Sequence, residues 1–347
     1  MRIMIIAPPW VAVPPAAYGG TEGVLDTLAR GLDRAGHDLL LFTTGDSTCD
    51  VPRASVLSRA IGVGKGGSAT ELRHVIHAYE AAIYAKADIV HDHTLVGPVY
   101  ADRFAGLPVV TTNHGPFQSE LGDYYRAIAA GTAIIAISHH QASTATGIPL
   151  AAVIHHGVDP DRFPAGDGDG RYAAFLGRMC PEKGIPTAIR AARRADMPLR
   201  IAAKMSEPAE LLYFERCVRP LLGGDIEYVG EVGGADKVAL LGSAVCLLNP
   251  IDWPEPFGMV MLEALACGTP VVATPMGAAP EIVDHGKTGF VCSGEETLAR
   301  AIGGAANLDR NECRKAVAGR FSADRMVADH LALYEKVIGG STMPLVA

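Results

Sequence analysis

Short apolar runs alternate with longer amphipathic stretches along most of the chain. Residues 21–35 place Val24, Leu25, Leu28, Ala29 and Leu32 on one stripe at helical spacing, and Gly36 follows as a stop signal. A second helix is expected at 71–85. Strands are expected between the helical stretches at 2–7, 38–43, 88–91, 109–113, 134–138 and 153–155. This alternation predicts βα repeats and parallel sheets, the α/β class of fold.

The alternation breaks once, near the middle of the chain. Residues 159–170 read DPDRFPAGDGDG, a polar stretch rich in proline and glycine that is typical of a domain junction. Strands then resume at 173–177, 199–203, 226–229, 245–249 and 271–273. We therefore predict two Rossmann-like domains, 1–160 and 161–322, facing a central cleft at the carboxyl ends of their strands. An extra amphipathic helix is expected to carry residues 323–347 back onto the first domain.

Length and composition agree with this organisation and narrow the class of protein. A chain of 347 residues is long for a single core, and 49% of its residues are hydrophobic. A net charge of −8 argues against a nucleic-acid binder. The seven cysteines are scattered without a C-x-x-C pair, which indicates a reducing compartment. The start, MRIMIIAPPW, is typical of a first strand rather than a signal peptide. We expect a cytoplasmic protein whose membrane contact is at most peripheral.

The strongest chemical signal is the stretch from Glu255 to Glu263, EPFGMVMLE. Prolines flank Glu255 and hold it in an extended loop, and a helix should begin near Gly258. The free N–H groups of Gly258, Met259 and Val260 would then form a seat for a diphosphate. Glu263 could accept hydrogen bonds from ribose hydroxyls, and Glu255 could reach a sugar hydroxyl. The alternative is an ordinary loop and helix with two solvated glutamates.

Two further loops have the composition of ligand-binding segments. In GRMCPEKG, residues 177–184, Arg178 and Lys183 should converge above a strand, where two fixed cations can neutralise a leaving diphosphate without a metal. In PPAAYGGTE, residues 14–22, Gly19 and Gly20 let the backbone approach a ligand closely. The alternatives are a βα loop with solvated charges and a merely flexible loop.

Together these residues resemble glycosyltransferase family 4, a family of retaining enzymes with the GT-B fold. The resemblance covers nearly the whole chain in the family's order. It rests on Y-G-G-T-E at 18–22, His91-Asp92-His93, His114-Gly115, Ala136-Ile137-Ser138, His156-Gly157-Val158-Asp159, G-R-x-x-x-x-K-G at 177–184, E-P-F-G-x-x-x-x-E at 255–263, and Glu281-Ile-Val-x-x-Gly286-x-x-Gly289-Phe290.

The resemblance implies a function and a role for each site residue. The chain would move a sugar from a UDP- or GDP-sugar to an acceptor hydroxyl in carbohydrate biosynthesis, with the acceptor on the first domain and the donor on the second. Arg178 and Lys183 would hold the donor phosphates, Glu263 the ribose and Glu255 the transferred sugar, with His114 beside the anomeric carbon. The remaining donor contacts would come from Gly19, Gly20, Val232, Phe257, Gly258, Met259 and Val260.

One segment departs from the family pattern. Residues 204–208 read KMSEP, where many members have a glycine-rich G-x-G. Lys204 could supply a charge there instead.

Metal chemistry has little support in the sequence. The histidines at strand ends lack a carboxylate at a zinc spacing, so they are interpreted as packing or supporting groups. The D-x-D strings at 159–161 and 167–169 lie in or beside the junction, where aspartate is an ordinary turn former. We therefore expect neither a metal ion nor a cofactor. Two alternative functions share the nucleotide site: a nucleotide-sugar epimerase and a non-catalytic nucleotide-sugar-binding protein.

Overall fold

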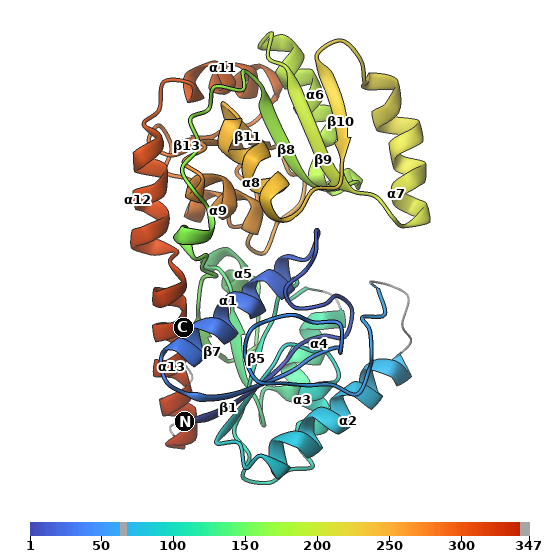
Figure 1. Ribbon diagram of the computed structural model, residues 1–347, viewed down its shortest axis with the longest axis vertical. Coiled ribbons are helices and arrows are strands. Elements are labelled where there is room, and N and C mark those ends of the chain that lie inside the picture. Colours follow the sequence, from blue (N-terminus) through green and yellow to red (C-terminus); the bar gives the residue numbers. More distant parts are fainter. Residues whose placement is uncertain (63–67, 119, 341–347) are drawn as a thin grey trace. The chain divides into compact units, whose positions relative to one another are not determined.

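The computed structural model describes residues 1–62, 68–118 and 120–340, so the last seven residues of the predicted C-terminal segment lie outside the described residues. The chain divides into two compact units (Figure 1). Unit 1 comprises Met1–Gly157 together with the segment from Ala323 onward, and unit 2 comprises Val158–Ser322.

The sheet of unit 1 has seven strands in the order β3-β2-β1-β4-β5-β6-β7, and all their pairings are parallel. Ile5 and Ile6, which point to opposite faces of the sheet from β1, are both 0% exposed, because helices cover both faces. The strands are β1 (Arg2–Ile6), β2 (Asp38–Phe42), β3 (Arg53–Ala54), β4 (Ile89–Asp92), β5 (Val109–Thr112), β6 (Ala133–Ala136) and β7 (Leu150–Val153).

The helices of unit 1 come from both ends of the chain. α2 (Ser68–Tyr84) and α3 (Gly97–Ala101) pack on Met4, Ile6 and Val90 of the sheet. α13 (Ala323–Ile338), in red in Figure 1, lies beside α1 (Gly20–Arg34), in blue, and contacts β5. The shorter helices are α4 (Glu120–Ile128) and α5 (His139–Ser143).

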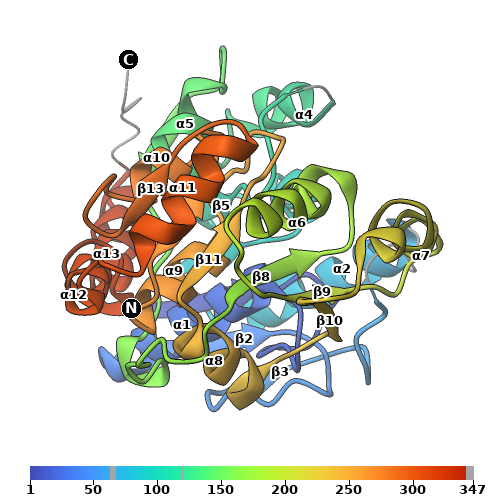
Figure 2. The same cartoon turned by 90° about the horizontal axis from the view of Figure 1, so that it is seen from above.

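Unit 2 repeats the same topology with six strands in the order β10-β9-β8-β11-β12-β13, again all parallel. Helices α6 (Ile185–Arg194) and α11 (Glu295–Ala305) pack together over one face of this sheet, as Figure 2 shows. The strands are β8 (Ala173–Arg178), β9 (Leu199–Lys204), β10 (Ile226–Gly230), β11 (Cys246–Asn249), β12 (Val271–Ala273) and β13 (Gly289–Val291).

Helix α9 (Met259–Ala266) contacts β11. α8 (Gly234–Ser243) and α12 (Arg310–Arg320) pack against α9. The short helices are α7 (Pro208–Tyr213) and α10 (Ala279–Ile282).

In both sheets the strand order reverses beside the first strand, between β1 and β4 in unit 1 and between β8 and β11 in unit 2. Ligands of open α/β sheets bind outside the carboxyl ends of the strands at this reversal. Most strands lie within one or two residues of their expected positions. The last strand of unit 1 is the exception: it was expected at 153–155 and lies at Leu150–Val153, because its alanines carry little strand signal.

All seven cysteines are free thiols. Within the described residues, no helix is both long and apolar enough to cross a membrane.

Candidate active site

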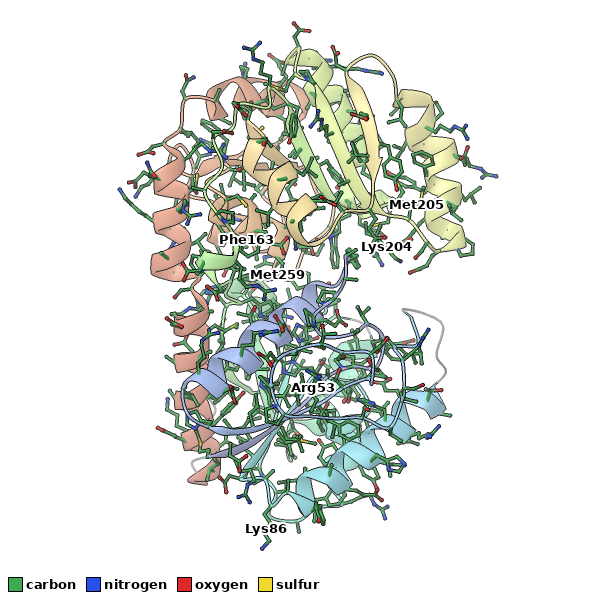
Figure 3. The ribbon with its side chains drawn as sticks, in the orientation of Figure 1. Arg53, Lys86, Phe163, Lys204, Met205 and Met259 are labelled. Carbon is green, nitrogen blue, oxygen red and sulfur yellow. The ribbon has the colours of Figure 1, made fainter. Side chains whose placement is uncertain are left out.

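The predicted phosphate-binding cations lie at the carboxyl ends of neighbouring strands in unit 2. Arg178 ends β8, Lys204 ends β9, and Lys183 follows in a short turn before α6. Figure 3 labels Lys204 where β9 ends and Met259 where α9 begins. Gly184 fixes the path after Lys183: its φ is 69°, and a Cβ there would lie 1.9 Å from the carbonyl oxygen of Pro250. The turn that presents Lys183 therefore requires glycine.

Glu255 is held by two donors on the same oxygen. Its Oε2 accepts a hydrogen bond from Trp253 Nε1 at 2.7 Å and forms an ion pair with Lys183 Nζ. The Lys183 ammonium also lies 5.6 Å from the centre of the Trp253 ring. The side chains of Lys183 and Glu255 are each only 15% exposed, so solvent screens their attraction weakly. Within the described residues, Oε1 of Glu255 has no hydrogen-bond partner and remains an available acceptor.

Glu263 is also paired, through a residue that the sequence motifs did not indicate. Lys237, on α8, places its Nζ 2.5 Å from Oε1 of Glu263, on α9. The pair links the two helices that follow β10 and β11. It keeps the Glu263 carboxylate close to a fixed positive charge, and leaves Oε2 without a partner among the described residues.

The start of α9 has the form expected of an anion-binding site. Gly258 caps the helix with a φ of 97°, and no side chain caps it. The first N–H groups of a helix have no partner within the helix, and here they belong to Met259 and Val260. Phe257, by contrast, is 2% exposed and packs edge-on against Phe321, so its contact with a ligand would be through its backbone.

Lys204 is already neutralised by two glutamates. Its Nζ lies 2.6 Å from Glu207 and 3.0 Å from Glu210. Burial opposes ionisation of Glu210, but the backbone N–H groups of Glu207 and Ser206 and the ammonium of Lys204 outweigh it, and the pKa of Glu210 is lowered. Arg178 Nε lies 4.0 Å from the same carboxylate. Lys204 is thus a structural cation rather than the free phosphate ligand that its position allowed.

These residues form what we call the ion-pair site. It contains four cations and four carboxylates, so its net charge is 4 − 4 = 0 before any ligand arrives: Arg178, Lys183, Lys204, Lys237, Glu207, Glu210, Glu255 and Glu263. Val232 lies in the loop between β10 and α8.

The remaining predicted residues belong to unit 1. Gly19 and Gly20 lie at the start of α1, at the cap and first position. Glu22, in the first turn, is buried, and this burial raises the pKa of its carboxyl group to about 7.

His114 follows β5 and lies in a group of five histidines, which we call the histidine cluster: His91, His93, His114, His156 and His330. Its Nε2 is 2.9 Å from Nδ1 of His93, and its ring stacks on that of His156. Burial lowers the pKa of His114 to about 4, with a contribution from His330, so the ring is neutral at pH 7.

The sequence motifs missed two partners of the predicted residues. Trp253 had a signal that could have found it, since it precedes Glu255 by two residues in the same proline-flanked loop. Lys237 had none, because nothing in its local sequence indicates that α8 packs on α9.

Comparison with known proteins gives two consecutive family matches. Residues 18–162 match the family described as Glycosyltransferase Family 4, and residues 160–318 match the family described as Glycosyl transferases group 1.

The relatives and solved structures cover the chain almost fully. A phosphatidyl-myo-inositol mannosyltransferase of Mycolicibacterium smegmatis is 28% identical, over 93% of this chain and 88% of its own. The crystal structure of AviGT4, a glycosyltransferase involved in avilamycin A biosynthesis, superposes with a TM-score of 0.75 at 26% identity, covering 98% of both chains. HepE from Anabaena, in complex with UDP and glucose, gives a TM-score of 0.74 at 22% identity, over 96% of this chain and 99% of its own.

Proposed function

Because the chain belongs to glycosyltransferase family 4 and has the GT-B fold, we propose that it is a retaining enzyme that transfers a sugar from a nucleotide diphosphate-sugar to an acceptor hydroxyl. The observation that carries this proposal is the arrangement around Glu255. Lys183 and Trp253 hold one carboxylate oxygen, which leaves the other to accept a hydrogen bond from the sugar. A group held in this way is preorganised for its ligand.

The donor lies on unit 2 in this proposal. Arg178 and Lys183 bind the diphosphate together with the N–H groups at Gly258, Met259 and Val260. Glu263 accepts hydrogen bonds from the ribose, and Lys237 orients it for that purpose. Val232 borders the nucleobase. UDP-sugars are the first donors to test, because HepE was crystallised with UDP, UDP-glucose, and UDP together with glucose.

Retention follows from attack on the same face that the diphosphate leaves. The bond between the anomeric carbon and the diphosphate oxygen breaks, a bond to the acceptor oxygen forms, and the acceptor proton passes to the leaving diphosphate. Arg178 and Lys183 stabilise the charge that develops on that group. A covalent intermediate would need a carboxylate beneath the sugar ring. In this proposal Glu263 is assigned to the ribose, and Glu255 to a sugar hydroxyl away from the anomeric carbon.

Metal independence is part of the proposal. Arg178, Lys183 and the N–H groups at the start of α9 already supply positive charge to the diphosphate. The start of α9 adds roughly 0.3–2 kcal/mol of attraction for an anion. Turnover that is lost in EDTA and restored by magnesium would contradict this part alone.

The proposal also covers the acceptor and the compartment. The name of the mycobacterial relative makes inositol-containing acceptors the first choice for a screen. Seven free thiols fit the cytoplasm, where disulfides are rare.

The decisive experiment incubates the protein with UDP- and GDP-sugars and a panel of acceptors, and determines the anomeric configuration of the product by NMR. We expect a product with the configuration of the donor. Glu255→Ala should abolish most transfer while its affinity for free UDP stays nearly unchanged, because its partner is on the sugar. Conversion of the donor sugar to an epimer would identify the alternative enzyme, and binding without release of the nucleotide would identify a non-catalytic binder. A sugar found covalently attached to the protein would overturn same-face attack.

A further inference from the structure

His93 and His114 share a hydrogen bond that has room for one proton. Nδ1 of His93 and Nε2 of His114 are 2.9 Å apart. Burial lowers the pKa of both rings, with neighbouring histidines adding to the effect, so both are neutral at pH 7. A neutral imidazole has one N–H and one bare nitrogen, so exactly one of the two facing nitrogens must carry the proton.

The second ring nitrogen of His93 determines which of the two facing nitrogens carries the shared proton. Nε2 of His93 is buried and has no hydrogen-bond partner among the described residues. If His114 donated, His93 would carry its own proton on Nε2, as a buried N–H without an acceptor. If His93 donates, the same nitrogen is bare. Buried N–H groups without partners are rarer in native structures than acceptors without full partners.

The protein contains a second histidine that fixes this choice by itself. His74 is also buried, and its Nε2 lies 2.9 Å from the carbonyl oxygen of Ala7, which can only accept. Its Nε2 must therefore carry the proton. The Nδ1 of His74, which is buried and has no partner within the described chain, is then bare. The interior of unit 1 thus already accommodates a bare, buried ring nitrogen of the kind required at His93.

We propose that His93 donates its Nδ1 proton to His114 and thereby fixes His114 in the tautomer that carries its own proton on Nδ1. His93 is then a positioning residue, and His114 presents an N–H donor rather than a basic nitrogen to its ligand. No described residue hydrogen-bonds to Nδ1 of His114, so this donor is available. It suits a hydroxyl of the donor sugar and is unsuited to removing a proton from the acceptor. This use of the proton rests on the proposed function, whereas the tautomer does not.

The tautomer is tested without any substrate. Two-bond ¹⁵N–¹H correlation spectra of the full-length protein at pH 7.5 distinguish a protonated from a bare ring nitrogen, and loss of one signal set in His114→Gln assigns His114 among the twelve histidines. We expect a protonated Nδ1 and a bare Nε2. The opposite pattern would overturn the proposal.

Variants of His93 test what sets the tautomer. His93→Leu removes the donor, and we expect His114 to lose the fixed pattern. His93→Asn places an amide nitrogen where Nδ1 lies, and should restore it. The matched control is His74→Leu, which removes another buried histidine and should leave the His114 signals unchanged. An unchanged pattern in His93→Leu would show that His93 does not set the tautomer.

Kinetic measurements test whether sugar transfer depends on the N–H group of His114. We expect His93→Leu to lower kcat about tenfold or more with unchanged affinity for free UDP, and His93→Asn to recover most of that loss. Full activity in His93→Leu would contradict a role for the tautomer in transfer. If the wild-type protein transfers no sugar from any donor, the proposed function fails, and the spectra still decide the tautomer.

Discussion

The histidine cluster of unit 1 and the ion-pair site of unit 2 are two ways of building a polar site. The first consists of neutral rings, whose pKa values are lowered by burial. The second consists of charged groups in close pairs, such as Lys183 with Glu255 and Lys237 with Glu263. Neutral groups can be buried deeply if their hydrogen bonds are met, whereas charges stay nearer to solvent and need partners. The two regions should therefore respond differently to pH and to substitution.

The largest expected effect is a loss of folding stability at low pH. Burial lowers the pKa of His74 and of His330 to about 4, against 6.5 in an unfolded chain. Between these values the unfolded state binds more protons, so the free energy of unfolding falls as the pH falls from 6.5 towards 4. At 1.36 kcal/mol per pKa unit, each histidine accounts for about 3 kcal/mol, a large part of a typical 5–15 kcal/mol.

We therefore expect unit 1 to unfold below about pH 5. The check is urea unfolding at a series of pH values, followed by the two-bond histidine spectra. A free energy of unfolding that stays constant from pH 7.5 to pH 4.5 would contradict the prediction.

The second-largest expected effect concerns the ion-pair site of unit 2. Lys183→Ala removes both the ion pair of Glu255 and a proposed diphosphate ligand, so kcat should fall by roughly 10²–10³-fold. Lys315→Ala is the matched control, because its pair with Glu312 is at the surface, where such pairs contribute little. It should stay within about twofold of wild type. Equal losses in the two variants would mean that the first acts through general stability.

Glu22, also in unit 1, should make the stability depend on pH in the opposite direction to the histidines. Burial raises the pKa of its carboxyl group to about 7, against 4.5 when unfolded. Between these values the folded state binds more protons, so the free energy of unfolding falls as the pH rises through this window, by about 3 kcal/mol in all. Glu22→Gln should therefore gain stability relative to wild type between pH 5 and pH 8. The exposed Glu80→Gln is the control and should show no such trend.

The smallest expected effect concerns the hydrogen bond that Trp253 donates to Glu255. Trp253→Phe keeps an aromatic ring and removes the N–H that donates to Oε2. A hydrogen bond to a charged group contributes about 1.5–3 kcal/mol, so kcat should fall by roughly 10- to 150-fold while UDP affinity, measured by calorimetry, is unchanged. Wild-type kcat in this variant would show that Lys183 alone positions the carboxylate.

The elements of the fold were predictable where the sequence is strongly patterned. Buried parallel strands read as apolar runs, which is why β1 and β12 were located closely. β3 is only two residues long and β13 is three residues that begin with Gly289, so neither gives a run that could be recognised. The alternation of strands and helices also predicted parallel sheets, since it requires crossover connections.

The contacts of the candidate site were less predictable than its residues. The motifs located Glu255, Glu263 and Lys183 but not which residues pair, because Lys183 is 72 residues from Glu255 and Lys237 is 26 residues from Glu263. Such pairs form when separate helices and loops pack together. The spacing of residues within a motif does not indicate that packing. For the same reason, the sequence offered Lys204 as a free charge, although two glutamates of the next turn bind it.

The return of α13 to unit 1 has a consequence for the order of events during synthesis. His91 hydrogen-bonds to Tyr334, which lies 243 residues later, and α13 covers α1. Unit 2 is one continuous segment, so all of it is available once Ser322 has left the ribosome. Unit 1 is translated first and yet must wait for the last helix. The half of the protein that is made earliest is therefore the half that finishes folding last.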